Sequence, residues 1–362
     1  MINVIGRVRT DSRSTILVLV SCFWLLPAAT QELDTGAHTL TQAAPGIYAV
    51  EPNFAGANAA VIIIDTSVIV VDSHSTPASS TTLIDSIREL TDKPIRYVIN
   101  THWHVDHHSG NEAYLENHMG EVDIIAHDYT REDIPTLGRE QFDQTAPYRS
   151  MPLEAAGAAL RSDTETLTDA QRSAIQKFHE AQQGFVTTGS AFEFTLPGVT
   201  IDRSLTLHSK VNTVQAMYLY PAHTRGDVVV YVPDQRVLIV GDILTKPILW
   251  TWSSYPQDYI KTLSALESLE VDKILIGHGG PILEGKEYLT TARQLMESIV
   301  AFSTASWDAG LSAEEAVKES ASDALLQSFR RRFVADIEQE NQMFDQMIGW
   351  TVDRAYLEMR EK

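Results

Sequence analysis

Residues 100–111 read NTHWHVDHHSGN and follow an apolar run that predicts a buried β-strand. Alternate side chains of an extended segment project to the same side, so we expect His102, His104 and Asp106 to face one cavity. His107, where the chain turns, can reach that cavity from the other side. Imidazole and carboxylate groups are good ligands for zinc and similar divalent metals. The stretch is therefore either part of a metal site or a loop that is merely rich in histidine.

Three further residues of ligand type each lie just beyond a predicted strand. His223 occurs in Pro-Ala-His-Thr-Arg-Gly-Asp, Asp242 in Val-Gly-Asp, and His278 in Gly-His-Gly-Gly-Pro. A glycine beside a ligand allows the backbone to turn sharply and to approach a metal closely. This pattern favours a metal cage built from strand ends that are distant in sequence.

The composition is that of a folded protein, with 44% hydrophobic and 21% charged residues. The formal net charge is −20, which argues against the basic face that binding to nucleic acid or to an anionic membrane surface requires. We therefore expect a small-molecule substrate and no nucleic-acid partner.

Residues 1–29 have the pattern of an export signal, because arginines precede the apolar run Ile16–Leu26 and small residues follow it. The run is too short to span a membrane, so we expect no stable membrane span in the mature protein. We predict an exported protein, periplasmic or secreted, that loses its only cysteine, Cys22, with the signal. Its metal chemistry must then use histidine and carboxylate. The alternatives are a buried N-terminal helix and lipoprotein anchoring at Cys22.

Two similar blocks of predicted strands and helices carry the candidate ligands, and a polar stretch of helical spacing, 128–185, separates them. We expect this stretch to be an inserted helical hairpin or lid. From Lys286 onwards the sequence predicts helices almost exclusively. An apolar stripe at helical spacing is expected to pack in the core, and it comprises Phe333, Ile337, Phe344, Ile348, Val352 and Tyr356.

The segment 101–111 resembles the first signature of the metallo-β-lactamase superfamily, Thr-His-x-His-x-Asp-His-x-Gly-Gly/Asn, with Ser109 where many members carry glycine. The motifs around the three later candidates match that family in the expected order, and the resemblance covers residues 45–285. It implies an α/β fold, a four-layer αβ/βα sandwich with the metals at one edge. We expect a hydrolase domain over 30–285, including the insertion, and a C-terminal helical region over 286–362.

The resemblance also implies a division of the ligands between two divalent metals. Asp242 would bridge the metals, and Asp72 would support the site from outside the ligand set. His74 and His108 lie near the site without an assigned role. The expected ligands are His102, His104 and His223 for one metal, and Asp106, His107 and His278 for the other.

The implied activity is hydrolysis by a hydroxide that bridges two divalent metals, with zinc expected and iron or manganese as alternatives. Asp106 and Asp242 would orient the hydroxide and relay its proton. The family's β-lactamases generally carry cysteine or serine at the position of Asp242, whereas its thioesterases of the glyoxalase II kind and its lactonases use aspartate. The resemblance therefore favours an ester, thioester or lactone as the substrate. The alternatives are β-lactam hydrolysis, an iron-dependent persulfide dioxygenase and a non-catalytic binding protein.

Three aromatic residues follow Asp242 closely, namely Trp250, Trp252 and Tyr255. They are expected either to wall the substrate cleft or to pack on the helical region.

Overall fold

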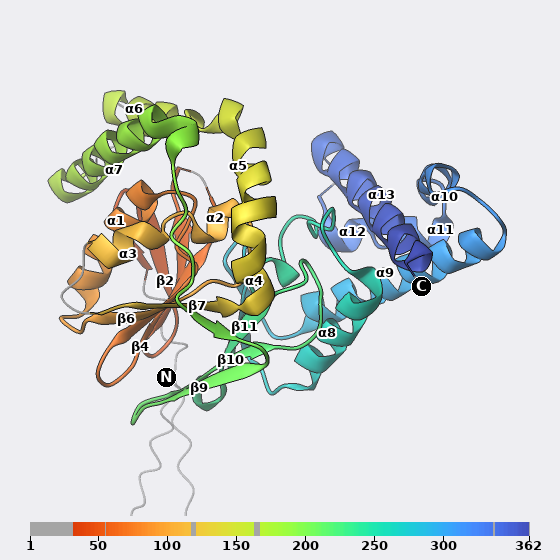
Figure 1. Cartoon of the computed structure of the whole chain (residues 1–362), viewed down its shortest axis with the longest axis horizontal. Helices are drawn as coiled ribbons and strands as arrows, with labels where there is room; N and C mark the ends of the chain where they lie inside the picture. Colours follow the sequence, from red (N-terminus) through yellow and green to blue (C-terminus); the bar gives the residue numbers. More distant parts are fainter. Residues whose placement is uncertain (1–31, 55, 117–120, 163–166, 336, 362) are drawn as a thin grey trace, which may run out of the picture. The chain divides into compact units, whose positions relative to one another are not determined.

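The computed structural model describes residues 32–54, 56–116, 121–162, 167–335 and 337–361 (Figure 1). The predicted signal over 1–29, with Cys22, lies outside the described residues. The described chain is built around two β-sheets, one of 8 strands and one of 6. Helices cover the outer face of each sheet, which confirms the α/β class predicted from the sequence.

The first sheet has its strands in sequence order from β1 to β8. Its first five strands run antiparallel, and β5 to β8 run parallel to one another. Helix α1 (Pro77–Leu90) connects the parallel strands β5 and β6, and it starts with Thr76 as its cap and proline in its first turn. The strands are β1 (Glu32–Asp34), β2 (His38–Ala44), β3 (Ile47–Pro52), β4 (Ala59–Ile63), β5 (Val68–Val71), β6 (Ile95–Ile99), β7 (Asp123–His127) and β8 (Val199–Ile201).

The second sheet has the strand order β14-β13-β12-β11-β10-β9. Its single parallel pair is β12 with β13, and helix α8 (Pro256–Ser268) connects these two strands. Each sheet therefore contains two parallel strands that are connected by a helix, β5-α1-β6 in the first and β12-α8-β13 in the second. Candidate ligands follow β6, β12 and β13. The strands are β9 (Ser204–His208), β10 (Thr213–Tyr218), β11 (Val228–Val232), β12 (Val237–Ile239), β13 (Lys273–Leu275) and β14 (Ile282–Glu284).

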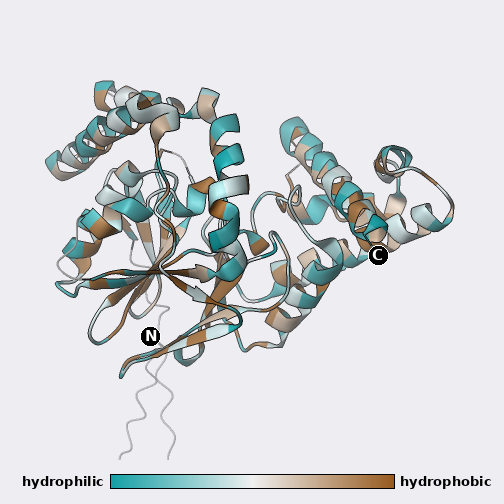
Figure 2. Cartoon of the chain, viewed as in Figure 1, coloured by the Kyte–Doolittle hydropathy of each residue, from teal (hydrophilic) through white to brown (hydrophobic). Residues whose placement is uncertain are grey.

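Strand β11 shows how the sequence produces two buried faces on one sheet. Val228, Val230 and Val232 belong to the apolar cluster that also contains residues of β3, β4 and β5, so they face the first sheet. Val229 and Tyr231 belong instead to the cluster formed with helices α8, α9 and α13. Alternate residues of a strand point to opposite faces, and both faces of β11 are buried. Figure 2 shows the hydrophobic residues concentrated on the strands.

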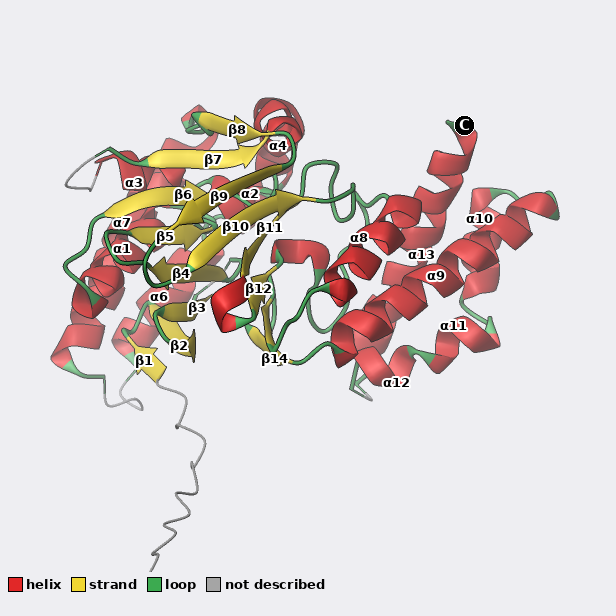
Figure 3. Cartoon of the chain, turned by 90° about the horizontal axis from the view of Figure 1, so that it is seen from below, coloured by secondary structure: helices red, strands yellow, loops and turns green. Residues whose placement is uncertain are grey.

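The outer layers complete the sandwich (Figure 3). Helix α1 and the short helix α3 (Asn111–Glu116) pack on the outer face of the first sheet, where Leu83, Ile84 and Tyr114 are fully buried or nearly so. Helices α8, α9 (Glu287–Asp308) and α13 (Glu338–Arg360) pack on the second sheet. The order of the layers is helix, sheet, sheet, helix, as the resemblance implied.

The predicted insertion is helical, as expected. It consists of α4 (Asp128–Asp133), a π-helical turn η1 (Ile134–Gly138), α5 (Arg139–Gln144), a 3-10 turn η2 (Ala146–Tyr148), α6 (Met151–Arg161), α7 (Asp169–Thr188) and a 3-10 turn η3 (Gly189–Ala191). Helix α7 begins with a capping box in which Thr168 and Gln171 satisfy each other's backbone N–H groups. The Gln171 amide also donates to the Asp34 carboxylate, 3.1 Å away, which links the insertion to β1.

The C-terminal region continues from α9 through α10 (Ala313–Ser320), α11 (Ala324–Ser328) and α12 (Arg330–Phe333) to α13. Most of the predicted apolar stripe is buried in the cluster shared with the second sheet. Ile337 is the exception, because it precedes α13 and is 54% exposed, so that part of the prediction was wrong. Among the described residues, no helix combines the length and the apolar character needed to cross a membrane.

Candidate metal centre

Four of the candidate ligands come from the segment that follows β6. His102 and His104 lie on the irregular chain after the strand, and helix α2 (Val105–His108) then carries Asp106 and His107. The alternation argument was therefore wrong for Asp106, because the backbone is already helical at that position. The turn after α2 is tight, since a Cβ atom on Gly110 would lie 2.0 Å from the Ser73 carbonyl oxygen.

The other three candidates follow strands of the second sheet. His223 lies in the loop after β10, Asp242 in a 3-10 turn after β12, and His278 after β13. Glycine beside these ligands permits a very close approach of the two loops. A Cβ atom on Gly277 would lie only 1.9 Å from Oδ1 of Asp242. The sharp turn at Gly241, with φ of 51°, positions the Asp242 backbone beside Gly277.

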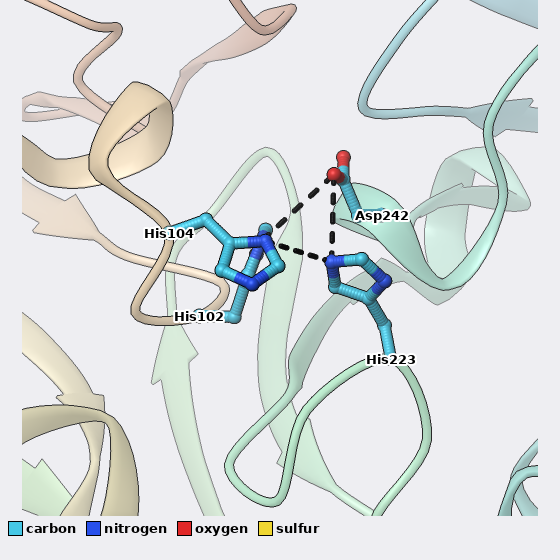
Figure 4. A group of neighbouring side chains, drawn as sticks. All are labelled: His102, His104, His223 and Asp242. Atoms are coloured by element: carbon cyan, nitrogen blue, oxygen red, sulfur yellow. Dashed lines mark hydrogen bonds and ion pairs between the residues drawn. The ribbon is translucent and has the colours of Figure 1, made fainter. Parts of the chain in front are cut away.

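All seven residues predicted from the sequence come together in two adjoining groups. The ligand atoms of His102, His104, His223 and Asp242 lie within 4.8 Å of one another (Figure 4), and those of Asp106, His107 and His278 form the second group.

Asp242 lies at the junction of the two groups. Its Oδ2 is 3.6 Å from Nε2 of His223 and 3.4 Å from Nε2 of His278, while its Oδ1 is 3.3 Å from Nε2 of His107. One carboxylate thus contacts histidines of both groups, which is the position a bridging ligand requires.

The hydrogen bonds of Asp72 fix two of the imidazoles. The Thr101 hydroxyl donates to Oδ2 of Asp72 at 2.8 Å, so its oxygen is left to accept from Nδ1 of His102 at 3.0 Å. Nδ1 of His107 also donates to Oδ2 of Asp72, at 2.8 Å. In both histidines Nδ1 is engaged by these hydrogen bonds, and Nε2 is directed at the other candidate ligands. The support predicted for Asp72 is present, but the part played by Thr101 was missed.

The loop after His223 is fixed in a similar way by Asp227. This carboxylate accepts from the Thr224 backbone N–H and from the Thr224 hydroxyl, both at 2.8 Å. No role is predicted for Asp227 from the sequence, although it is the last residue of the segment Pro-Ala-His-Thr-Arg-Gly-Asp that contains His223.

Buried atoms without partners provide a test of whether the residues fit a metal. Nε2 of His102, Nε2 of His107 and Oδ1 of Asp242 are buried, and each has no hydrogen-bond partner among the described residues. A buried polar atom left unpaired costs about 1–3 kcal/mol. Nε2 of His107 lies 3.3 Å from Oδ1 of Asp242, and Nε2 of His102 lies 3.9 Å from its Oδ2, so divalent cations bound beside Asp242 would satisfy these atoms. The residues therefore fit a metal centre.

The protonation states agree with that interpretation. Burial lowers the pKa values of His102 and His104 well below the ordinary value, so both imidazoles are neutral and able to bind a cation. Burial alone would raise the pKa of Asp242, but the adjacent His278 and His107 lower it well below its ordinary value. Burial alone would lower the pKa values of His107 and His278, but Asp242 and the other nearby carboxylates raise them, to about 10 for His278. The site thus combines the neutral imidazoles of His102 and His104 with an ionised Asp242.

A cleft of about 260 Å³ lies beside His104, and its lining includes Trp103, Trp252, Ser253 and Tyr255. The Trp252 ring stacks on the His104 imidazole, with ring centres 4.7 Å apart and an interplanar angle of 12°. The aromatic residues that follow Asp242 thus divide between this cleft and the helical region, and whether the cleft binds substrate stays a prediction.

Trp252 and Tyr255 wall the cleft, whereas Trp250 packs on Trp350 of α13.

The two nearby histidines without an assigned role lie outside both ligand groups. His108 shares a hydrogen bond of 3.0 Å through Nε2 with the Trp103 carbonyl oxygen, and its ring contacts Phe194. Nδ1 of His74 lies 2.9 Å from the Ala57 carbonyl oxygen, and the His74 ring stacks on His38. These contacts give both residues a packing role.

Comparison with known proteins identifies the family to which the sequence is similar. Residues 52–278 match the sequence profile of the metallo-beta-lactamase superfamily. A linear primary-alkylsulfatase of Pseudomonas sp. is 24% identical over 266 residues, which are 69% of this chain and 47% of that protein.

Solved structures share the fold. The inverting sec-alkylsulfatase Pisa1 from Pseudomonas sp. gives a TM-score of 0.59 at 16% identity, over 88% of this chain and 50% of that one. A metallo beta lactamase from Erythrobacter litoralis gives a TM-score of 0.50 at 15% identity, over 74% of this chain and 100% of that one. The chain thus spans about half the length of the alkylsulfatases it matches.

Proposed function

This chain belongs to the metallo-β-lactamase superfamily, and on that basis we propose that it is a metal-dependent hydrolase of ester-type bonds. The observation that carries the proposal is the convergence of seven histidine and aspartate side chains in two adjoining groups. Their unpaired buried atoms are those that a cation would satisfy.

In this proposal His102, His104 and His223 hold one divalent metal, and Asp242 contributes to both. Asp106, His107 and His278 hold the second metal. When bound, two zinc ions would supply Lewis acidity to the substrate and would lower the pKa of a coordinated water. Zinc is our first choice because imidazole and carboxylate groups suit it, and iron and manganese are the alternatives.

Asp106 is the group we propose to accept a proton during the reaction. Its carboxylate is 27% exposed at the open side of the site, and its Oδ2 lies 3.1 Å from Nε2 of His278. Burial alone would raise the pKa of Asp106, but His107 and His278 lower it below the ordinary value, so the carboxylate is ionised. Oδ2 of Asp106 can therefore accept a hydrogen bond from an attacking water and so orient it. Because the lowered pKa makes this carboxylate a weak base, we propose that it relays the proton of the water onward rather than retaining it. Asp242, which is buried, would orient the water from the inner side.

Within the ester class, a sulfate ester is the first substrate to test. Two of the similar proteins are named alkylsulfatases, and both are matched over most of this chain. The aromatic walls of the cleft, Trp103, Trp252 and Tyr255, would contact an apolar part of the substrate. Carboxylic esters, thioesters and lactones remain in the proposal because the same site chemistry cleaves them.

We also propose that the protein is exported, on the basis of the sequence pattern of residues 1–29. The hydrolase domain then comprises residues 30–285, and residues 286–362 are its C-terminal helical region.

The test is an activity panel on protein whose metal content has been measured. The panel contains alkyl and aryl sulfates, a carboxylic ester, a thioester, a lactone and a chromogenic cephalosporin. We expect turnover of a sulfate or another ester, loss of that turnover with a chelator, and recovery when zinc is restored. Protein that holds one iron and consumes oxygen, or that turns over only the cephalosporin, would contradict the proposal.

Two variants connect activity to the ligands. His223→Ala and Asp106→Ala are each expected to lower metal content and turnover together. Full metal content in both variants would refute the assignment of the ligands.

A further inference from the structure

We propose that Ser253 is a positioning residue that fixes the tautomer of His104 and so presents Nδ1 of that imidazole to the metal. The proposal rests on the metal site described above. It assigns a role in metal binding to a residue from the loop 250–255, which contributes none of the seven ligands.

The two ring nitrogens of His104 have different surroundings. Nδ1 points into the ligand group and lies 2.9 Å from Nε2 of His223 (Figure 4). Nε2 points away from that group and lies 3.3 Å from Oγ of Ser253. Only Nδ1 can therefore serve as the ligand atom.

The hydrogen bonds of Ser253 decide which nitrogen of His104 carries the proton. The Ser253 hydroxyl lies 2.9 Å from the His223 carbonyl oxygen, which can only accept, so the single hydroxyl proton is donated there. The oxygen of Ser253 is then left to accept from the N–H at Nε2 of His104. Nδ1 consequently keeps its lone pair for a cation, which is the arrangement that supports metal-binding histidines in general.

Ser253 also joins two ligands of the same proposed metal. It contacts the imidazole of His104 and the backbone of His223, which are 119 positions apart in the chain. Trp252 completes the support by stacking on one face of the His104 ring. The loop 250–255 thus supplies both the hydrogen bond at Nε2 of His104 and a stacking contact on its ring, while Trp103 packs against the same ring from outside the loop.

This loop is itself held by helix α13. The Thr351 hydroxyl lies 2.8 Å from the Thr251 hydroxyl, and both side chains are buried. Arg354 donates from Nε to the Ser254 carbonyl oxygen at 2.7 Å, with its guanidinium over the Tyr255 ring. Ser253 therefore has a fixed place relative to His104 even though it lies beside an open cleft.

The experiment measures metal affinity rather than activity. Wild type, Ser253→Ala, Ser253→Thr and Ser254→Ala are titrated with zinc in competition with a chromophoric chelator. Ser254→Ala is the matched control, because the Ser254 hydroxyl also donates to a backbone carbonyl, that of Thr251, at 2.7 Å. Thermal unfolding of each metal-free protein serves as a check on the fold.

We expect Ser253→Ala to weaken the binding of one of two zinc ions by about tenfold to a hundredfold, the usual cost of losing a partner of a metal-binding histidine. Ser253→Thr keeps the hydroxyl and is expected to restore most of that affinity, whereas Ser254→Ala leaves both affinities unchanged. Equal affinities in wild type and Ser253→Ala, or equal losses in the two alanine variants, would overturn the proposal. A protein that binds two zinc ions as expected but hydrolyses nothing in the panel contradicts the proposed function alone.

Discussion

Oδ2 of Asp72 lies 2.8 Å from Nδ1 of His107 and also accepts from the Thr101 hydroxyl at 2.8 Å. A single oxygen thus fixes His107 directly and His102 through Thr101. The hydrogen bonds of the Asp72 side chain go to Thr101 and His107, so we expect its effect on a metal to pass through these two imidazoles.

We predict that Asp72→Asn lowers metal affinity by about tenfold to a hundredfold, because the amide replaces one accepting oxygen with a donor. Asparagine is the suitable substitution, since Asp72 has a φ of 63° and asparagine tolerates the left-handed region. Zinc titration measures the effect. Affinity equal to that of the wild type would show that the bonds of Asp72 do not orient the ligands.

We predict that Gly277→Ala abolishes tight metal binding, because its Cβ atom would lie 1.9 Å from Oδ1 of Asp242 and would force that carboxylate aside. Gly280→Ala is the matched control in the same loop, since nothing lies within 4 Å of its added Cβ atom. Metal content after dialysis distinguishes the two variants. Equal metal content in both would mean that the Asp242 carboxylate is free to move without loss of the site.

We predict that Arg354→Ala lowers the free energy of unfolding of the metal-free protein by about 2 kcal/mol. The variant loses a hydrogen bond from a charged group to the Ser254 carbonyl oxygen, and such bonds contribute about 1.5–3 kcal/mol. Denaturant titration gives the value. Arg331→Ala, at an exposed position on α12, is the control and should change stability by less than about 0.5 kcal/mol. A smaller effect at Arg354 than at Arg331 would contradict the prediction.

The stacked pair His38 and His74 predicts a loss of stability in mild acid. Burial lowers the pKa of His74 from 6.5 to about 4 and lowers the pKa of His38 well below its ordinary value. The unfolded chain therefore binds protons at these histidines below pH 6.5, while the folded protein does not, so stability falls as the pH decreases. For His74 alone this amounts to about 2 kcal/mol between pH 7 and pH 5.

His38→Phe tests this prediction without disturbing the metal centre. The variant removes one of the two buried titrating groups, while all other histidines stay common to both proteins. We expect its free energy of unfolding to fall less steeply between pH 7 and pH 5 than that of the wild type. Parallel curves for the two proteins would show that His38 is not a source of the pH dependence.

The positions of the ligands could be predicted from the sequence because each follows a short apolar run that forms a strand. Local signals also located the helical character of the insertion. The course of the chain between ligands was less predictable. The sequence pattern predicts an extended segment at Asp106, but this residue lies in α2. The alternation of side chains along a strand does not indicate where the chain after the strand becomes helical.

Most of the residues that hold the candidate ligands in place could not be predicted from the sequence. Ser253 contacts His104 across 149 positions, and nothing in the local sequence of the loop identifies that partner. Ile337 was placed in the apolar stripe by its spacing, but the helix begins only at Glu338, so the spacing did not apply to it. Partners in space and the exact start of a helix depend on tertiary packing, which a periodic pattern does not encode.

The contact between α13 and the loop 250–255 has a consequence for the order in which the site is assembled during synthesis. The seven candidate ligands are synthesised before Thr351 and Arg354, which hold the loop. A metal ion that met the nascent chain at that stage would find every ligand but an unsupported His104. Tight loading is therefore expected to follow the docking of α13, so that an unfinished chain does not retain metal as the complete one does.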